Sequence, residues 1–458
     1  MTETTTNLVI DLTHGGVKIA INLAKKGEKV YAYDIYNTLK IDEKKLLKNY
    51  KVELIQLKDI NKLRNNLKVI YPIHLPLTHE EIKKHNPDLN YTFITHHKAV
   101  KELLKEWGKN ILKVEITGVK GKTSSVFMLK EILIDKNPLI LSSLGAIFYN
   151  NGKKSLLKKN ISITPANIKE TIDLANGKDY NLAIFENSLG ACGIGDVGLL
   201  TNIAENYSIA KNKCNAAEAK KQIFDCNLVV CQKESLDKYY SDIHHEKINS
   251  FSLDDKNANL YLNDVNFSLD KTIMDLEYKD MITLKGERIS GNFKVESFAP
   301  GLHHVSNVLG VVLTCLSLNI DKEKIISGLK KYKGIKGRTN KKTIKNSIII
   351  EEINPGINTK AIKESINMIK DLKNYYIAIG GDYGITCEEI DEKKVSEFLD
   401  TISNDIILTG PVGNGILDKM KNKPKYMENY NEVYDLAIKN NKNLLFIYRS
   451  NYSKLSKR

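Results

Sequence analysis

The sequence predicts an α/β protein of three domains, each built on a mostly parallel sheet with helices on both faces. Short apolar runs alternate with stretches of helical spacing along most of the 458 residues, a pattern typical of βα units that form parallel sheets. A chain of this length corresponds to two to four domains at about 100–200 residues each. The composition is 42% hydrophobic, which suffices for several cores. A third observation is a glycine-containing turn at residues 117–121, which joins an apolar run directly to a helical stretch.

The first domain is expected to span residues 1–108. An apolar run at 7–12 predicts a strand, Gly15 and Gly16 form a tight turn, 17–26 has helical spacing, and 29–34 predicts a second strand. This βαβ unit has a turn that a ligand can approach closely, but it lacks the full G-x-G-x-x-G pattern of dinucleotide-binding proteins. Histidines at expected turns favour a binding surface here, although a single turn histidine is usually just solvated: His14, His74, His79, His96 and His97.

The second domain, 109–336, begins with a phosphate-binding pattern. The expected strand 111–116 leads into Thr-Gly-Val-Lys-Gly-Lys-Thr at 117–123, and a helix follows at 125–134. Backbone N–H groups of such a turn face an anion, a lysine supplies a positive charge to the β- and γ-phosphates, and a threonine hydroxyl is placed to bind Mg²⁺. The pattern therefore favours a bound nucleotide with Mg²⁺ over an ordinary turn, and the expected contacts are Gly118, Val119, Lys120, Gly121, Lys122, Thr123 and Ser124; the family resemblance given below implies that the nucleotide is ATP.

Further strands and turns complete the second domain and form the third. Strands are expected at 182–185, 197–201 and 228–231, an edge β-region at 245–295, and a helix at 304–318. In the third domain, 337–458, glycine-rich turns follow two expected strands, and ligands bind at such carboxyl ends in open α/β sheets. The elements expected there are strands at 347–351, 376–379, 405–408 and 444–447, and turns at 380–384 and 410–413.

Composition excludes several classes of protein. The six cysteines form no CxxC pair, which argues against a zinc site or a disulfide framework. No apolar run approaches the roughly 20 residues that span a bilayer, and the first residues lack a secretory signal, so a cytoplasmic protein without a membrane partner is expected. The net charge of +14 fits either solvated lysines or a surface that attracts a small anionic substrate. No basic motif with interleaved aromatic residues indicates nucleic acid, and the oligomeric state is left open.

Several segments beyond the phosphate loop follow one another in a recognisable order, and together with the loop they resemble a three-domain Mur-type ATP-dependent ligase. The resemblance implies a Rossmann-like N-terminal substrate domain, a central P-loop ATPase domain and a C-terminal Rossmann-like α/β domain. It covers most of the chain and is carried by Ile163-Thr164-Pro165, Phe185-Glu186-Asn187-Ser188, Thr201-Asn202-Ile203-Ala204-Glu205-Asn206-Tyr207, Ala219-Lys220-Lys221-Gln222-Ile223-Phe224, Gly301-Leu302-His303-His304-Val305-Ser306-Asn307 and Gly337-Arg338.

The resemblance also implies roles for individual residues. Lys122, Glu186, Lys220 and Arg338 form the expected catalytic set, in which Thr123 and Glu186 hold Mg²⁺. A carbamylated Lys220 holds a second Mg²⁺, and an unmodified one binds phosphate or a structural carboxylate. Asn307 contacts adenine or, alternatively, caps a helix. Arg338 reaches the phosphates when the domains close, or is an ordinary linker arginine.

Two departures from the family pattern stand out. Tyr207 occupies the position of the usual metal-binding histidine, so this position is not expected to bind a metal. The usual Asp-x-x-His-Asn-Pro of the third domain is Glu351-Glu352-Ile353-Asn354-Pro355 here. Glu351 and Glu352 are the candidates for ribose contact or for support of domain closure, with a strand-end surface glutamate as the alternative for either one, and Glu352 is the expected nucleotide contact.

Six segments narrow the resemblance further: Asp11-Leu12-Thr13-His14-Gly15-Gly16, Tyr33-Asp34-Ile35-Tyr36, Gly118-Val119-Lys120-Gly121-Lys122-Thr123, Ser162-Ile163-Thr164-Pro165-Ala166, Glu186-Asn187-Ser188-Leu189-Gly190 and Thr201-Asn202-Ile203-Ala204-Glu205. On these residues the chain resembles the branch of the family that closes a carbocyclic ring on a nickel tetrapyrrole. The similarity implies an anionic nickel tetrapyrrole precursor as substrate. It would be cradled by His14, Gly15, Gly16, Asp34, Tyr36 and Thr164. His14 would contact a carboxylate, lie at the axial face of nickel, or only cap a turn. Two alternatives remain: a pseudomurein ligase that adds an amino acid to a UDP-linked peptide, and a non-catalytic nucleotide-binding protein, which the tyrosine at 207 favours.

Overall fold

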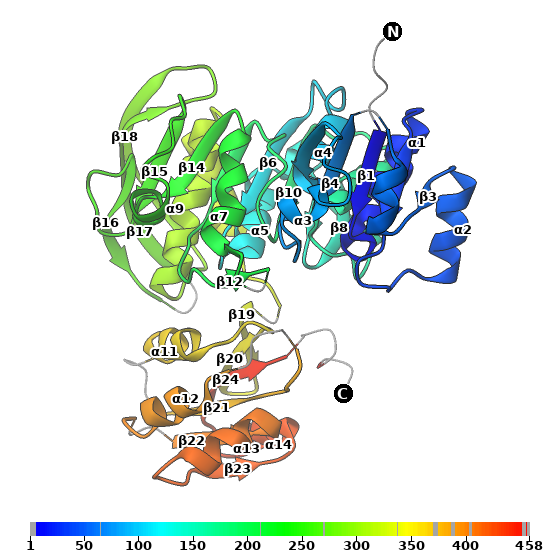
Figure 1. Cartoon of the computed structure of the whole chain (residues 1–458). Coiled ribbons are helices and arrows are strands. Elements are labelled where there is room, and N and C mark those ends of the chain that lie inside the picture. The colour runs from blue at the N-terminus through cyan, green and yellow to red at the C-terminus, as the bar shows by residue number, and fades with distance from the viewer. Residues whose placement is uncertain are drawn as a thin grey trace. The chain divides into compact units, whose positions relative to one another are not determined.

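The computed structural model describes residues 6–64, 66–210, 212–268, 271–336, 338–369, 374–385, 390–402, 405–450 and 455. The chain forms two compact units (Figure 1). Unit 1 consists of Met1–Val265, Met274–Val295 and Ser306–Lys330. Unit 2 consists of Asn266–Ile273, Glu296–Val305 and Lys331–Arg458.

Unit 1 begins with a parallel five-stranded sheet in the order β3-β2-β1-β4-β5. The chain moves outward from β1 in one direction through β2 and β3, and then in the other direction through β4 and β5. The strands are β1 (Thr6–Ile10), β2 (Val30–Tyr33), β3 (Glu53–Leu54), β4 (Leu67–Tyr71) and β5 (Tyr91–Thr95). The helices are α1 (Val17–Lys25), α2 (Ile41–Asn49), α3 (His79–Lys83) and α4 (His96–Leu103), with short helical turns at Leu12–Gly16 and Leu57–Lys62.

The second sheet of unit 1 has eleven strands in the order β18-β17-β16-β15-β14-β11-β6-β10-β7-β8-β9. Its middle, from β16 to β7, is parallel, whereas β8 and β9 extend one edge antiparallel. The strands are β6 (Leu112–Thr117), β7 (Leu139–Ser142), β8 (Gly145–Asn150), β9 (Lys153–Lys158), β10 (Leu182–Glu186), β11 (Val197–Leu200), β14 (Leu228–Gln232), β15 (Ile248–Ser252), β16 (Leu260–Asn266), β17 (Thr272–Ile282) and β18 (Arg288–Ser297). The edge β-region expected at 245–295 is therefore confirmed.

The helices that accompany this sheet include the one that begins at the phosphate loop. They are α5 (Lys122–Ile132), α6 (Pro165–Leu174), α7 (Ala216–Lys220), α8 (Lys233–Tyr239), α9 (Leu302–Ser317) and α10 (Lys322–Lys331), with short turns at Ile134–Lys136 and Lys221–Asp225. A separate antiparallel pair consists of β12 (Ser208–Ile209) and β13 (Cys214–Asn215).

The two sheets of unit 1 share one hydrophobic core. Val9 and Val100, from the first sheet and its helix α4, belong to the same buried cluster as Ile168 of α6 and Phe185 of β10. A polar contact joins the same elements, because Lys18 of α1 donates to the side chains of Asn167 (2.5 Å) and Glu170 on α6. The turn that carries the predicted substrate residues is thereby held against the N-terminus of α6.

Unit 2 carries a six-stranded sheet in the order β19-β20-β24-β21-β22-β23, in which only the β19–β20 pair is antiparallel. The strands are β19 (Arg338–Ile344), β20 (Ser347–Ile353), β21 (Tyr375–Gly381), β22 (Asp405–Thr409), β23 (Lys425–Met427) and β24 (Asn443–Arg449). The helices are α11 (Thr359–Asn367), α12 (Glu392–Leu399), α13 (Gly410–Lys419) and α14 (Tyr430–Lys439). Separate apolar clusters include Ile377 and Ala378, neighbours on β21 that point to opposite faces.

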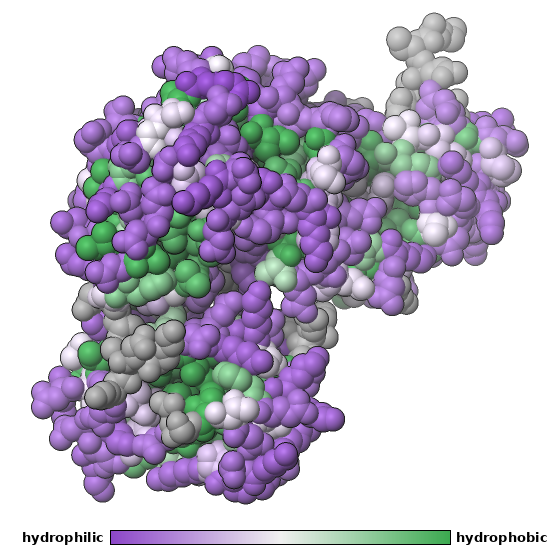
Figure 2. Space-filling view, turned by 90° about the vertical axis from the view of Figure 1, so that its left-hand side faces the viewer, coloured by the Kyte–Doolittle hydropathy of each residue, from purple (hydrophilic) through white to green (hydrophobic). Residues whose placement is uncertain are grey.

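The expected α/β fold with mostly parallel sheets is confirmed. The face shown in Figure 2 is largely hydrophilic, with smaller apolar areas between polar ones. Among the residues that the structure describes, no helix is both long enough and apolar enough to cross a membrane.

Candidate functional site

The phosphate loop lies where the sequence predicts it, between β6 and α5 of unit 1. Gly118 and Gly121 have positive φ angles of 138° and 85°, a backbone conformation that residues with a Cβ atom rarely adopt. A Cβ atom at Gly118 would lie 2.0 Å from Thr201 Oγ1, and one at Gly121 would lie 1.9 Å from Asn307 Oδ1. The loop thus needs glycine at both positions, and Asn307 lies against its second glycine. Ser124 belongs to the first turn of α5.

Thr201 and Asn202, which directly follow β11, hold the phosphate loop in place with hydrogen bonds. The Thr201 hydroxyl donates to Lys120 O (2.6 Å), and Val119 N donates to Asn202 O (2.9 Å). The Asn202 amide adds a bond in each direction, accepting from Lys120 N and donating to Lys120 O, both at 3.2 Å. These bonds fix the loop conformation, so its amides are organised before any anion binds.

Lys122, Thr123 and Glu186 meet at the carboxyl ends of β6 and β10. The Lys122 side chain folds back over the loop, and its ammonium donates to the carbonyl oxygens of Gly118 (2.9 Å) and Val119 (3.3 Å). The Thr123 hydroxyl donates to Glu186 Oε1 at 2.9 Å. A carboxylate and a hydroxyl at hydrogen-bond distance are hard oxygen donors of the kind that Mg²⁺ prefers. The donor set therefore fits the predicted cation.

Ser143 completes this oxygen cluster, although the sequence-based reasoning missed it. Its hydroxyl lies 3.1 Å from Thr123 Oγ1, and its backbone N–H donates to Glu186 Oε2 at 3.0 Å. A signal was present, since Ser143 comes directly after the buried strand β7, in the stretch Ser-Ser-Leu-Gly at 142–145. β7 pairs with β10, the strand that carries Glu186, and a polar residue at the carboxyl end of such a strand is a candidate ligand in this class of sheet.

A buried carboxylate orders the segment that follows Glu186. Glu115 is fully buried in β6 and accepts backbone N–H bonds from Cys192 (2.7 Å), Ile194 (2.7 Å) and Gly195 (3.1 Å). Burial raises the pKa of Glu115, while these N–H groups act in the opposite direction. The Glu115 carboxylate thus accepts hydrogen bonds from backbone N–H groups of the loop that follows β10. It thereby fixes this loop next to β6, the strand that leads into the phosphate loop.

Lys220 lies at the end of α7 and is fully buried. Its ammonium donates to Ser188 O at 2.9 Å, two residues beyond Glu186. Burial, together with the positive charge of Lys122, lowers the pKa of Lys220 to about 7. The ring centroid of Tyr207, the residue that replaces the usual histidine, lies 5.7 Å from Lys220 Nζ. Tyr207 therefore faces the candidate lysine with an aromatic ring.

The predicted substrate residues of the first sheet gather around the turn after β1. Asp11 is fully buried, and His14 Nδ1 lies 2.6 Å from its Oδ2. His74 Nε2 lies 3.2 Å from the same oxygen, and the Tyr36 ring packs edge-on against His14 with centroids 5.8 Å apart. Burial opposes ionisation of Asp11, but hydrogen bonds from both histidines hold its pKa well below its usual range. The same pairing raises the pKa of His14.

Gly15 and Thr164, distant in sequence, are brought together at the N-terminus of α6. A Cβ atom at Gly15 would lie 2.6 Å from Ala166 Cβ and 3.7 Å from Thr164 Oγ1, and Gly15 has a φ of 101°. A Cβ atom at Gly16 would lie 2.2 Å from Asp11 O. Both glycines are therefore required by close packing of the turn.

Other predictions for the first sheet have different outcomes. Asp34 Oδ2 accepts a hydrogen bond from Leu39 N at 2.8 Å, so this carboxylate orders its own loop. The expectation that His96 and His97 belong to an exposed binding surface is wrong. Both are buried in the first turn of α4, which is capped by Thr95, and burial lowers their pKa values to about 4 and 3.

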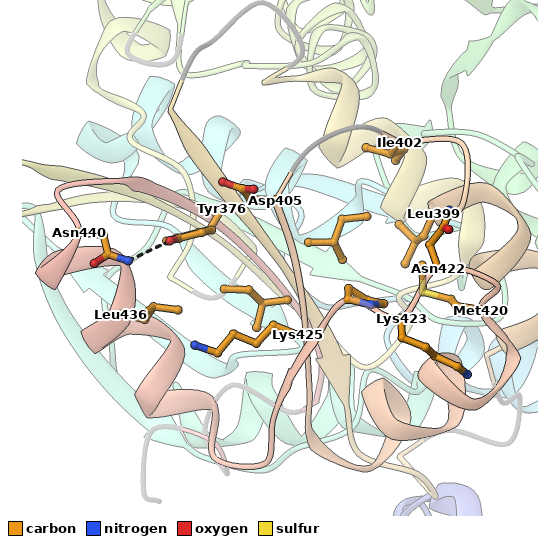
Figure 3. A pocket seen from close by; sticks show the side chains of 13 residues that line it. Tyr376, Leu399, Ile402, Asp405, Met420, Asn422, Lys423, Lys425, Leu436 and Asn440 are labelled. Carbon is orange, nitrogen blue, oxygen red and sulfur yellow. Dashed lines mark hydrogen bonds between the residues drawn. The ribbon is translucent and has the colours of Figure 1, made fainter.

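The predicted residues of unit 2 are only partly described. Arg338 begins β19, but its side chain lies outside the described residues, as does Gly337. Glu352 lies in β20, and its side chain is buried. A cavity of about 1030 Å³ lies at the predicted glycine-rich turns and includes Asp382 and Gly410 in its lining. A second, of about 500 Å³, contains none of the predicted site residues and is lined by Tyr376, Asp405, Lys425 and others (Figure 3).

Comparisons with known proteins agree with this geometry. Residues 116–315 match the family "Mur ligase middle domain", and residues 341–451 match "Coenzyme F430 synthetase CfbE, C-terminal domain". Coenzyme F(430) synthetase of Methanocaldococcus jannaschii is 31% identical over 439 residues, which cover 93% of this chain and 95% of that protein. The protein of that name from Methanosarcina acetivorans is 27% identical over 431 residues, 88% of this chain and 89% of that one.

A solved structure shares the fold. MurF ligase from Thermotoga maritima, determined in complex with ADP, has a TM-score of 0.57 at 15% identity and covers 86% of this chain and 94% of that chain. The fold and the phosphate-loop site thus define the Mur ligase class, and the Mur-like architecture expected from the sequence is confirmed. Since a relative more than 30% identical matches nearly its whole length, the chain belongs to the coenzyme F(430) synthetase family.

Proposed function

We propose that this protein is an ATP-dependent ligase that activates a carboxylate as an acyl phosphate and closes the carbocyclic ring of a nickel seco-tetrapyrrole acid. ADP and phosphate are the other products. The observation that carries the proposal is the similarity to coenzyme F(430) synthetase over 93% of the chain. The arrangement of Lys122, Thr123 and Glu186 around the phosphate loop supports the ATP-dependent half of the reaction.

A carboxylate needs activation because nucleophilic attack adds charge to a centre that is already anionic. Conversion to an acyl phosphate provides a leaving group. Lys122 and the loop amides stabilise negative charge that grows on the transferring phosphoryl group. Thr123 and Glu186 hold Mg²⁺, which supplies positive charge to the phosphate oxygens when it is bound. The bracing of the loop by Thr201 and Asn202 keeps these groups in place during transfer.

The residues around the nucleotide take further roles in this proposal. Asn307, which lies against Gly121, contacts the adenine side of ATP. Arg338 reaches the phosphates and Glu352 the ribose when the domains close, and closure limits wasteful hydrolysis. Lys220 holds a second Mg²⁺ once it is carbamylated. Its lowered pKa supports this role, because only the neutral amine reacts with CO₂.

The acceptor in this reaction is part of the same molecule as the activated carboxylate. A carbon of the macrocycle attacks the acyl phosphate, a new carbon–carbon bond forms, and phosphate leaves while the carbon loses a proton. Holding both groups on one bound molecule removes much of the entropic cost of the encounter. The turn with His14, Gly15 and Gly16, together with Asp34, Tyr36 and Thr164, cradles this substrate. The net charge of +14 favours capture of a polycarboxylate.

The test is incubation of the purified full chain with ATP, Mg²⁺ and the nickel seco-precursor. We expect the tetrapyrrole to lose one water per ADP released. Mass spectrometry and visible absorption follow the tetrapyrrole, and a coupled assay follows ADP. The Lys122→Ala variant is the control and should release little ADP. An unchanged tetrapyrrole beside a protein that still binds ATP would overturn ring closure and redirect the assay to UDP-linked peptide acceptors. ATP binding without turnover for any acceptor would favour the non-catalytic alternative.

A further inference from the structure

Three potential metal-ligand atoms converge at the turn after β1. Asp11 Oδ2 lies 2.6 Å from His14 Nδ1 and 3.2 Å from His74 Nε2, and the two nitrogens are 3.1 Å apart. Three ligands on one face of an octahedral ion with bonds of about 2.1 Å are about 3 Å apart. The triangle therefore has the dimensions of a facial metal-binding triad. Among the residues that the structure describes, no other group of three such side chains converges in this way.

The position in the fold also indicates a ligand site. Asp11 follows β1, and His74 follows the neighbouring parallel strand β4. These two strands flank the point at which the strand order reverses in the sequence β3-β2-β1-β4-β5. Ligands of open α/β sheets bind at the carboxyl ends of strands at this reversal, because the following loops diverge there.

The backbone fixes Asp11 so that one oxygen remains for the histidines. Its Oδ1 accepts backbone N–H bonds from Thr13 (2.9 Å) and His14 (3.2 Å), and Asp11 itself has a φ of 69°. A non-glycine residue in this region is held there by its surroundings. The His14 and His74 side chains are 44% and 23% exposed, so the triangle is accessible from solvent while its carboxylate corner is buried.

Hydrogen bonds among Asp11 Oδ2, His14 Nδ1 and His74 Nε2 cannot give all three atoms a suitable partner. If both imidazoles donate to Asp11 Oδ2, two N–H groups face each other across 3.1 Å. If one is deprotonated on that nitrogen, the carboxylate loses a donor. A cation is the single partner that accepts all three lone pairs at once. We propose that Asp11 Oδ2, His14 Nδ1 and His74 Nε2 bind one divalent transition-metal ion.

The donor chemistry defines the class of ion. Two imidazole nitrogens and one carboxylate suit borderline ions such as Co²⁺, Ni²⁺ or Zn²⁺, whereas Mg²⁺ and Ca²⁺ prefer oxygen donors. The site is thus distinct from the oxygen cluster of Thr123 and Glu186. The nickel of a tetrapyrrole accepts only axial ligands, so the facial triad selects a free ion. If the proposed function holds, the remaining coordination positions take a carboxylate of the anionic substrate.

Binding of the metal alone tests the proposal and does not depend on the ligase activity. The tag-free full chain, in excess Mg²⁺ to saturate the oxygen-rich site, is titrated with Co²⁺ by calorimetry and visible absorption. We expect one Co²⁺ per chain, with d–d bands of a nitrogen–oxygen site, and displacement by Ni²⁺ or Zn²⁺. His74→Ala should weaken binding at least about 10-fold by removing one of three ligands.

Two further variants make the result decisive. Asp11→Asn should also weaken binding, and circular dichroism shows whether that buried substitution preserves the fold. His85→Ala removes a histidine of the same sheet region that lies outside the triad, and should bind Co²⁺ like the parent. Absence of Co²⁺ binding, or equal binding by the parent and a folded His74→Ala variant, would overturn the metal site. Equal weakening by His85→Ala would also overturn it, because the ion would then be held by surface histidines.

Discussion

The buried Lys220 makes the stability of unit 1 depend on pH in a predictable direction. The pKa of its ammonium is lowered from 10.5 to about 7 by burial and by Lys122. Between these two values the unfolded state binds more protons at this position than the native state does. The free energy of unfolding therefore rises as the pH increases from about 7 to 10.5, and this gain is lost progressively as the pH falls from 10.5 to about 7. Each pH unit corresponds to about 1.4 kcal/mol, so the whole window corresponds to about 5 kcal/mol.

Comparison with Lys220→Met isolates this contribution from other titrating groups. Trp107 is the single tryptophan and packs against Phe185 in the shared core, with ring centroids 6.1 Å apart, so its fluorescence reports on unit 1. Urea unfolding is followed in CO₂-free buffer at pH 7 and pH 9.5. The free energy of unfolding of the parent minus that of Lys220→Met should be about 3 kcal/mol larger at pH 9.5 than at pH 7.

The control for this experiment is Lys221→Met, because that neighbouring lysine is about half exposed. The difference in the free energy of unfolding between the parent and Lys221→Met should not change over the same pH range. If the parent and Lys220→Met keep a constant difference, within about 0.5 kcal/mol, then the lysine is charged in both states at pH 9.5. The argument that burial depresses its pKa would then be refuted.

Three further outcomes are expected. In ¹³C-bicarbonate near pH 8, the parent should show a carbamate carbonyl NMR signal that Lys220→Met lacks; its absence from both would favour the unmodified ammonium. Gly121→Ala should reduce binding of a fluorescent ADP analogue by at least about 10-fold, since its Cβ would lie 1.9 Å from Asn307 Oδ1 and strained φ values cost about 1–3 kcal/mol; parent-like affinity would contradict the tight loop. Glu186→Gln should raise the Mg²⁺ concentration needed for half-maximal turnover by about 10-fold, because it removes a charged oxygen ligand; an unchanged Mg²⁺ titration would exclude Glu186 as a ligand.

Local patterns predicted the phosphate loop accurately because its chemistry is encoded by consecutive residues. The apolar run, the two glycines with positive φ and Lys122 belong to one strand–turn–helix unit. The order of strands and helices followed from the same kind of local periodicity. These are features in which a short stretch of sequence determines its own conformation.

Features that depend on tertiary contacts could not be predicted from local sequence patterns. His74 joins Asp11 only because β1 and β4 are neighbours, and no local pattern gives that pairing. Ser143 joins Glu186 through the β7–β10 pairing in the same way. The wrong placement of His96 and His97 has another cause. Thr95 caps α4, so the two histidines enter a helix whose first turn is buried against the sheet.

The hydrophobic core that β1, α4, α6 and β10 share has a consequence for protein engineering. Families built from exchangeable modules allow one domain to be transplanted onto another without loss of folding. Here the first sheet is not such a module, because cutting the chain near Gly108 would strip Val100 and Ile168 of packing partners and leave Lys18 without its carboxylate on α6. Apolar surface of this kind promotes aggregation. A chimera that exchanges the first sheet must therefore carry α6 along with the first hundred residues.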